Sequence, residues 1–164
     1  MNMEMNKRTQ EKRKKSVKFM KEILLIRTWG ENNLTVNKET KSLGMSWEKE
    51  YGYAQAVKVR DTIYVSGQVS HDDRGNIVGR GDMEAQMRQA YANLQKVLAQ
   101  YGATVENIVD EILFVTDMDT AFAAAVKCRQ DIFSGTPVVA STIVQIQRLA
   151  FPELMIEIRC VAKV

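Results

Sequence analysis

The strongest constraint in the sequence is the strict alternation of its last eleven residues, LMIEIRCVAKV. In a β-strand, successive side chains point to opposite faces. One face would be apolar and the other would carry all the charges: Leu154, Ile156, Ile158, Cys160 and Ala162 against Met155, Glu157, Arg159, Val161 and Lys163. Glu157 and Arg159 are therefore predicted to lie about 6–7 Å apart on a sheet face that no helix covers.

Two segments have the spacing of amphipathic helices. The first, Met83–Tyr101, is preceded by Asp82 as a predicted N-cap. Its apolar stripe recurs every three or four residues: Met87, Tyr91, Leu94, Leu98 and Tyr101. The second helix is predicted from Thr120 to Phe133, and the sequence places Phe122, Val126, Arg129 and Phe133 on one of its sides.

The remaining apolar runs predict strands. A hairpin is expected from residue 53 to residue 69 with its turn at Arg60-Asp61, and further strands are expected at 22–29, 108–117, 141–149 and 154–164. Residues 31–50 are interpreted as a surface segment with a short extended piece at 34–36. This order predicts an α+β domain with both helices on one face of the sheet. The other face would expose apolar residues such as Val57, Val65 or Val144, depending on register, which favours an oligomer.

Size and charge predict one domain with a basic extension. A chain of 164 residues has the size of a single domain. Residues 1–27 hold nine Lys or Arg and three Glu, whereas the rest of the chain is mildly acidic. We therefore expect a flexible basic arm at 1–21 and one folded domain at 22–164. No apolar run is long enough to span a membrane, and the two separate cysteines fit a cytoplasmic protein.

Several kinds of catalytic site lack sequence support. The chain has one histidine, His71, and contains no GxxxxGK[ST], GxGxxG, HExxH or GxSxG motif. Its cysteines, Cys128 and Cys160, form no CxxC pair, so a zinc site of cysteines is excluded. We read both cysteines as buried apolar residues and His71 as a residue of a polar surface loop.

Parts of the sequence resemble the RidA/YjgF family, also called the L-PSP or reactive-intermediate deaminase family. The resemblance is carried by WEKEYGYAQAVKVRDTIYVSGQV, FVTDM and LAFPELMIEIRCVA, and it covers about residues 44–164. It implies a chorismate-mutase-like fold, with one mixed sheet and two helices on one face, and a homotrimer with clefts between subunits. It also implies hydrolysis of 2-imino or enamine acids without a cofactor.

The resemblance assigns roles to particular residues. The family's cleft tyrosine falls on Tyr53, and the serine and glycine of its SGQ element fall on Ser66 and Gly67. Its water-orienting glutamate falls on Glu157, which would act as a general acid or base. An interface salt bridge is the alternative role for Glu157, and packing at the sheet edge is the alternative for Tyr53.

One family residue is missing. The arginine of the P-A-R-S segment, which holds the substrate carboxylate, aligns with Ser141 or with Val139, and the family's cleft asparagine aligns with Val126. The chain is thus similar to a divergent branch with an AST-like segment, in which Ser141 and Thr142 are the expected substrate contacts. Arg159 could replace the arginine as an anchor for an anionic ligand, or it could form an ion pair across the trimer.

Three functions remain open from the sequence. The first is a small-molecule hydrolase or deaminase, with weak or no activity on 2-imino acids because the arginine is missing. The second is a non-catalytic trimer that binds a ligand or protects proteins. The third is an RNA-acting protein, a ribonuclease or translation inhibitor, which only the basic arm supports. The expected partners are a small anionic ligand and two further copies of the chain, but neither nucleic acid nor a membrane.

Overall fold

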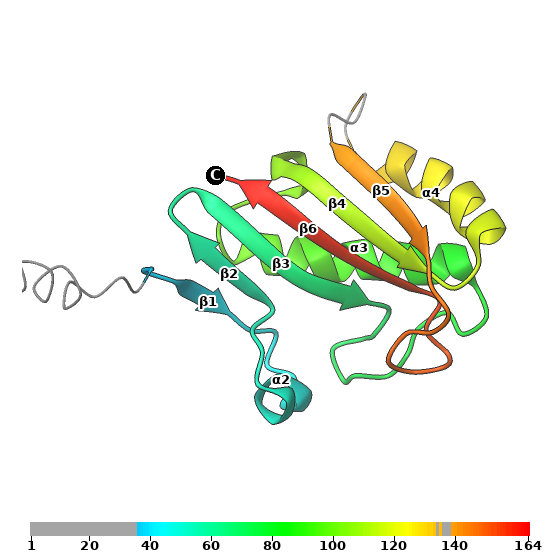
Figure 1. The fold of residues 1–164 in the computed structure, drawn as a ribbon, viewed down its shortest axis with the longest axis horizontal. Helices are drawn as coiled ribbons and strands as arrows, with labels where there is room; N and C mark the ends of the chain where they lie inside the picture. Colours follow the sequence, from blue (N-terminus) through cyan, green and yellow to red (C-terminus); the bar gives the residue numbers. More distant parts are fainter. Residues whose placement is uncertain (1–35, 134, 136–138) are drawn as a thin grey trace, which may run out of the picture. The chain divides into compact units, whose positions relative to one another are not determined.

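The computed structural model describes residues 36–133, 135 and 139–164, of which those from 37 onward belong to one compact unit. The expected basic arm, the expected strand at 22–29 and the domain boundary at residue 22 lie outside the described residues. The elements are β1 (Glu39–Lys41), α2 (Ser46–Tyr51), β2 (Ala56–Val59), β3 (Thr62–Val69), α3 (Met83–Ala99), the 3-10 helix Val105–Asn107, β4 (Ile108–Val115), α4 (Met118–Ile132), β5 (Ala140–Gln145) and β6 (Ile156–Lys163) (Figure 1). No described helix is long and apolar enough to cross a membrane.

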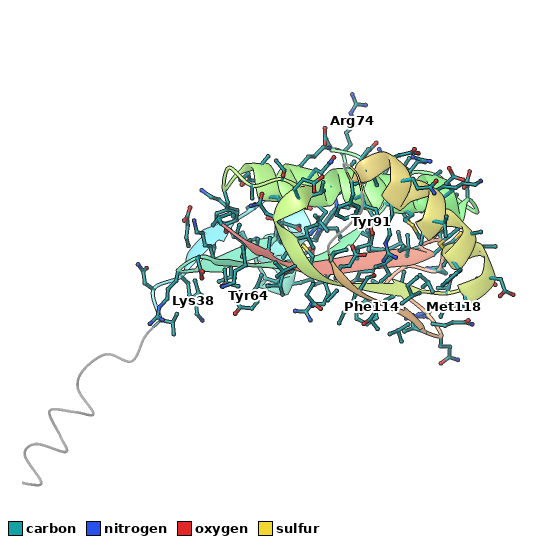
Figure 2. The ribbon with its side chains drawn as sticks, turned by 90° about the horizontal axis from the view of Figure 1, so that it is seen from above. Lys38, Tyr64, Arg74, Tyr91, Phe114 and Met118 are labelled. Carbon is teal, nitrogen blue, oxygen red and sulfur yellow. The ribbon has the colours of Figure 1, made fainter. Side chains whose placement is uncertain are left out.

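The strands form one mixed sheet in the order β1-β2-β3-β6-β4-β5. Neighbouring strands are antiparallel except β4 and β5, which are parallel. Figure 2 shows α3 and α4 on the same face of the sheet, with Tyr64 and Phe114 on the opposite face. The predicted α+β fold with a single mixed sheet is therefore confirmed, and so is the β2–β3 hairpin, whose turn residue Arg60 has a φ of 55°.

The last strand, β6, lies at the centre of the sheet between β3 and β4. Its residues Ile156, Ile158, Cys160 and Ala162 are at most 1% exposed and belong to the core under the helices. Glu157, Arg159 and Val161 alternate with them and are half-buried on the other face. The alternation read from the sequence therefore holds along the whole strand.

Helix α3 supplies most of the layer that covers β6. Asp82 caps it, accepting a hydrogen bond of 3.0 Å from the Ala85 backbone N–H, as predicted. The expected stripe residues from Met87 to Leu98 are buried. The helix ends at Ala99, two residues earlier than predicted, and Tyr101 packs on the core from the following turn.

The four residues predicted to share one side of α4 have different environments. Phe122 and Val126 are 63% and 52% exposed, whereas Phe133 is 5% exposed and Arg129 pairs with the buried Glu111. The helix instead buries its small residues: Ala121, Ala124, Ala125 and Cys128. Short side chains allow the helix to approach the sheet and α3 closely, so the larger apolar residues are left on the outer side.

The helix-free face of the sheet carries apolar side chains, as expected for an oligomer. Tyr64 is 47% exposed and Val144 is 38% exposed. The register places Val57 on this face opposite Tyr64, whereas Val65 points the other way and is buried under the helices.

A buried ion pair joins the sheet to α4. The Glu111 side chain on β4 is completely buried, and its carboxylate accepts hydrogen bonds from Arg129 of α4 at 2.5 Å and from the Tyr91 hydroxyl of α3 at 2.9 Å. Arg129 also donates to the Ser141 hydroxyl of β5. Although burial alone would lower it, the neighbouring Glu111 carboxylate raises the pKa of Arg129. The charge inside the core is therefore balanced by its partner.

Replacing Arg129 by methionine should strongly destabilise the fold. The Glu111 carboxylate would remain buried without its cation, at a cost of about 3–5 kcal/mol. Urea unfolding measures the change. Arg88→Met is the matched control, because Arg88 forms ion pairs with Glu84 and Asp131 at the surface, where such pairs contribute little. Equal stability losses in the two variants would contradict the role given to the buried pair.

Candidate functional site

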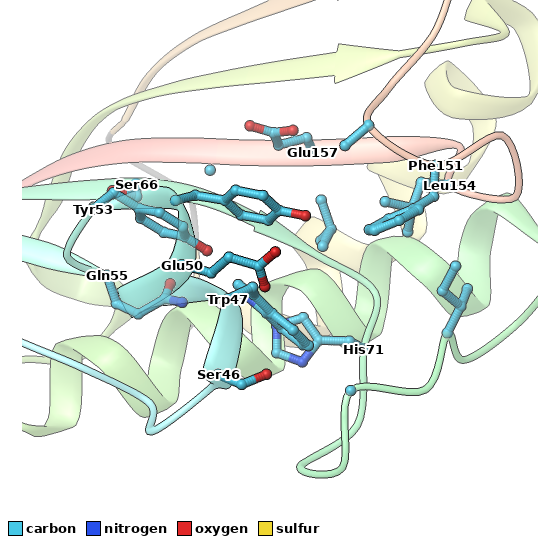
Figure 3. A pocket seen from close by; sticks show the side chains of 16 residues that line it. Ser46, Trp47, Glu50, Tyr53, Gln55, Ser66, His71, Phe151, Leu154 and Glu157 are labelled. Carbon is cyan, nitrogen blue, oxygen red and sulfur yellow. The ribbon is translucent and has the colours of Figure 1, made fainter.

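A pocket of about 580 Å³ opens between α2, the first part of the chain after β3, and the loop before β6. Figure 3 shows the Glu157 side chain entering it from β6 and the Trp47 and Glu50 side chains entering it from α2. The pocket is lined by sixteen residues: Ser46, Trp47, Glu50, Tyr51, Tyr53, Gln55, Ser66, Gly67, Val69, His71, Gly75, Ile77, Ala150, Phe151, Leu154 and Glu157.

The contact between Glu157 and Gly67 fixes the carboxylate at the pocket wall. A Cβ atom added to Gly67 would lie 1.8 Å from Glu157 Oε1, so the carboxylate occupies the space of the missing side chain. The register of β3 against β6 shifts between Val65 and Gln68, as at a β-bulge beside a glycine. The backbone of Gly67 does not adopt a positive φ, so its conformation does not require glycine. Glycine is required here because Glu157 occupies the space that a side chain would need.

Glu157 is a carboxylate without a partner in the part of the chain that the structure describes. Its residue neighbours across the strands are Val69 and Phe114, which offer no hydrogen bond from their side chains. Burial raises the pKa of Glu157 above its ordinary value. A carboxyl group in this position can exchange a proton with a bound water or ligand at a pH closer to neutral.

Tyr53 and Ser66 both line the pocket, but their hydroxyl groups differ in whether they can still donate a hydrogen bond to a ligand. The Tyr53 side chain is partly open, and burial raises the pKa of its hydroxyl, with the charges of Glu48 and Glu157 adding to the effect. The Ser66 hydroxyl donates a hydrogen bond of 2.7 Å to the Ala54 carbonyl oxygen. Ser66 therefore shapes the backbone of the pocket, whereas the Tyr53 hydroxyl can donate a hydrogen bond to a ligand.

Trp47, His71 and Gly75 form the wall opposite β6. The Trp47 and His71 rings meet edge to face, with centroids 5.3 Å apart. Gly75 has a φ of 85°, and a Cβ there would lie 2.7 Å from the Trp47 ring. The prediction of a surface role for His71 is wrong: the residue is 6% exposed because Trp47 covers it, and its Nδ1 lies 2.9 Å from the Asp72 carbonyl oxygen.

A buried glutamate holds α2 in place at the pocket. Glu48 is 6% exposed and accepts hydrogen bonds from the Leu43 backbone N–H at 3.0 Å, from Gln55 at 2.9 Å and from the Ser42 hydroxyl. Burial acts to raise its pKa, but these hydrogen bonds hold the pKa of Glu48 below its ordinary value. Gln55 in turn accepts from Gln68 at 2.7 Å, so a polar network ties α2 to β3 beneath the pocket.

The sequence-predicted site residues fall into two groups. Four of them, Tyr53, Ser66, Gly67 and Glu157, line the pocket together. The other three do not line it: Ser141, Thr142 and Arg159. Ser141 and Thr142 belong to β5, which is separated from β6 by β4, and the exposed Ser141 accepts a hydrogen bond from Arg129 of α4. The roles given to these three residues stay predictions.

Trp47, Glu50 and His71 are among the lining residues that the sequence did not predict. Two of them belong to α2, which has only six residues and was interpreted as part of a surface segment. A helix this short shows no repeating apolar pattern, although Gly52, its C-cap with a φ of 71°, is a signal for a helix end.

The described residues contain no group of three or more His, Cys, Asp or Glu side chains arranged to hold a metal ion.

Known proteins resemble the chain over the region that contains this site. The family described as Endoribonuclease L-PSP matches residues 46–164. RutC family protein YjgH of Escherichia coli (strain K12) is 32% identical over 115 residues, or 70% of this chain and 85% of that protein. The solved structure of protein YJGH has 30% sequence identity and a TM-score of 0.69, covering 79% of this chain and 98% of that one. A 2-iminobutanoate/2-iminopropanoate deaminase of Dermatophagoides farinae is 31% identical over 67 residues, 41% of this chain and 52% of that protein.

The contact between Gly67 and Glu157 can be tested with a double-mutant cycle. Gly67→Ala should lower the melting temperature, because the new methyl group must displace the carboxylate. In a Glu157→Ala background the same substitution meets no carboxylate and should have little effect. Thermal unfolding of the four proteins gives the coupling, and an equal loss in both backgrounds would contradict the contact.

The burial of Glu157 predicts a pH-dependent gain of stability in Glu157→Gln. A raised pKa means that the folded state favours the protonated carboxyl group, so stability is fully present below the ordinary value of 4.5 and falls as pH rises through the folded-state pKa. The neutral glutamine avoids that loss. The variant should melt a few degrees higher than the wild type at pH 7, since about 1 kcal/mol corresponds to about 2–4 °C in a chain of this size. Below pH 4 the two melting temperatures should converge, and a gain that persists there would contradict the assignment.

Proposed function

The chain belongs to the endoribonuclease L-PSP family, and from that membership we propose that its pocket hydrolyses a reactive imine, enamine or related carbonyl-derived metabolite. The similarity to a protein named 2-iminobutanoate/2-iminopropanoate deaminase supports the reaction type. The observation that carries the proposal is the half-buried carboxylate of Glu157, which lines the pocket and has no partner among the described residues. Burial raises the pKa of this carboxyl group.

In the proposed reaction, Glu157 accepts and returns a proton. Its carboxylate accepts a proton from a water molecule while the water oxygen attacks the carbon of a protonated C=N bond, which gives a neutral carbinolamine. The protonated carboxyl then returns the proton to nitrogen. As the C–N bond breaks and ammonia leaves, the Glu157 carboxylate takes the hydroxyl proton, a carbonyl group remains, and this proton passes on to ammonia or solvent. An enamine enters the same sequence after its carbon has taken up a proton. The Tyr53 hydroxyl would orient the ligand by donating a hydrogen bond.

A homotrimer belongs to this proposal. The exposed Tyr64 and Val144 on the helix-free sheet face, together with Phe122 and Val126 on α4, offer apolar surface for contacts between copies. In such an assembly, Ser141, Thr142 and Arg159 would serve the pocket only if a neighbouring protomer brought them there. We also keep a cytoplasmic location as part of the proposal.

A ligand-binding trimer without turnover is the second candidate function. It is favoured by the absence of lysine and arginine among the described lining residues, which removes the usual anchor for a carboxylate substrate. The same absence does not favour an RNA-acting protein, because phosphate contacts depend on cationic side chains.

The proposal predicts ammonia release from imines that depends on Glu157. Imines without a carboxylate, generated in place by an amine oxidase, should be hydrolysed faster with the wild type than without it. Glu157→Gln should reduce the rate by about 10²–10⁴-fold, the usual contribution of a general acid–base group. We expect weak or no activity on 2-imino acids generated by an amino-acid oxidase.

Light scattering provides the control for this assay. Wild type and Glu157→Gln should both have three times the chain mass of 18.6 kDa, so that lost activity is not lost assembly. Full activity in the variant would contradict the role of Glu157. Ligand binding by the wild type without any ammonia release would favour the second candidate.

A further inference from the structure

All formal charge on the wall of the pocket is negative within the part of the chain that the structure describes. Glu157 enters from β6 and Glu50 from α2, and no lysine or arginine lines the pocket. In Figure 3 the Glu157 carboxylate lies beside β6, and the Glu50 carboxylate lies below it in that view, near Trp47. On the wall that one copy of the chain supplies, an anionic ligand would meet two like charges and no opposite charge.

Two cations near the lining segments form ion pairs away from the pocket, and neither Lys49, Arg74, Arg148 nor Arg159 lines it. Lys96 forms an ion pair of 2.5 Å with Asp73, which lies in the chain between His71 and Gly75. Arg80 forms one of 2.8 Å with Glu153, the residue before Leu154. Neither of these cations lines the pocket, and both are neutralised by a carboxylate of their own.

Aromatic rings occupy much of the remaining surface. Trp47, Tyr51, Tyr53 and Phe151 line the pocket together with His71. Tyr51 is 69% exposed, Phe151 54% and Tyr53 39%, so their rings have surface left for a ligand to cover. The faces of such rings attract cations, above all where water is partly excluded. A positively charged nitrogen would also give the Glu157 carboxylate the partner that it lacks among the described residues.

We propose that this pocket selects a ligand with an apolar or aromatic body and a positively charged nitrogen, and discriminates against a carboxylate ligand of the same size. The inference rests on the proposed function, because a protonated imine and its parent amine are ligands of this class. It replaces the anionic ligand expected from the sequence with a cationic one. Glu157 then has two roles, attracting the charged nitrogen and exchanging the proton.

Three probes of one shape test the charge preference of the full chain. Phenethylamine is cationic, 2-phenylethanol is neutral and 3-phenylpropanoate is anionic, and isothermal titration calorimetry at pH 7 measures the binding of each. We expect phenethylamine to bind at least about ten-fold more tightly than 3-phenylpropanoate, with 2-phenylethanol between them. Similar affinities for all three, a preference for 3-phenylpropanoate, or no measurable binding of phenethylamine would overturn the proposal.

Substitutions at Glu50 show whether the preference arises in this pocket. Glu50→Gln should weaken phenethylamine binding several-fold, and Glu50→Lys should reverse the order of phenethylamine and 3-phenylpropanoate. Glu39→Gln is the matched control, because it removes the same charge from β1, outside the pocket, and should leave the preference unchanged. An unchanged preference in Glu50→Lys would overturn the proposal.

The proposed ligand class and the proposed reaction can be contradicted independently of each other. If phenethylamine is preferred but no imine is hydrolysed, the ligand class stands and the proposed reaction fails. If imines are hydrolysed in a Glu157-dependent way but the probes show no charge preference, the reaction stands and the ligand class fails.

Discussion

The position of β6 between β3 and β4 is the constraint on which the rest of the structure depends. Because the strand is hydrogen-bonded on both sides, its alternate residues must divide between two environments. Ile156 and Ile158 lie in the core beneath α3, and Glu157 between them is forced to the helix-free face. One element thus stabilises the domain and places the acidic group of the pocket.

Gly67 leaves the space in which the Glu157 carboxylate lies at the pocket wall. If residue 67 carried a side chain, the Glu157 carboxylate would have to move away from the wall of the pocket. The carboxylate instead rests against the backbone of β3, beside Tyr53, and is partly shielded from water without being neutralised. Glu111 shows the contrasting arrangement, since its burial is balanced by Arg129 and Tyr91. The core neutralises its carboxylate, whereas the pocket leaves its own without a partner in the described part of the chain.

Membership of the family and the charges of the pocket lead to different expectations about the ligand. The chain belongs to the endoribonuclease L-PSP family, and one similar protein is named a 2-iminobutanoate/2-iminopropanoate deaminase. The lining contains Glu50 but lacks a cation among its described residues, so a carboxylate is the least suitable ligand group. The proposed reaction thus rests on similarity to relatives, whereas the proposed ligand class rests on the charges of this chain's own pocket.

The sequence by itself determined the elements that have a regular period: β6, the stripe of α3 and the β2–β3 hairpin. It also indicated Tyr53, Gly67 and Glu157, because a resemblance preserves their order along the chain. Only the tertiary structure decided that α4 packs through Ala121 and Ala124, and that Trp47 and Glu50 reach the pocket while Ser141 does not. The physical reason is that periodicity records which face of an element is apolar, whereas meetings between distant segments depend on strand order and on short elements such as α2. Six residues are too few to show a period, and β4 inserted beside β6 keeps β5 away from Glu157.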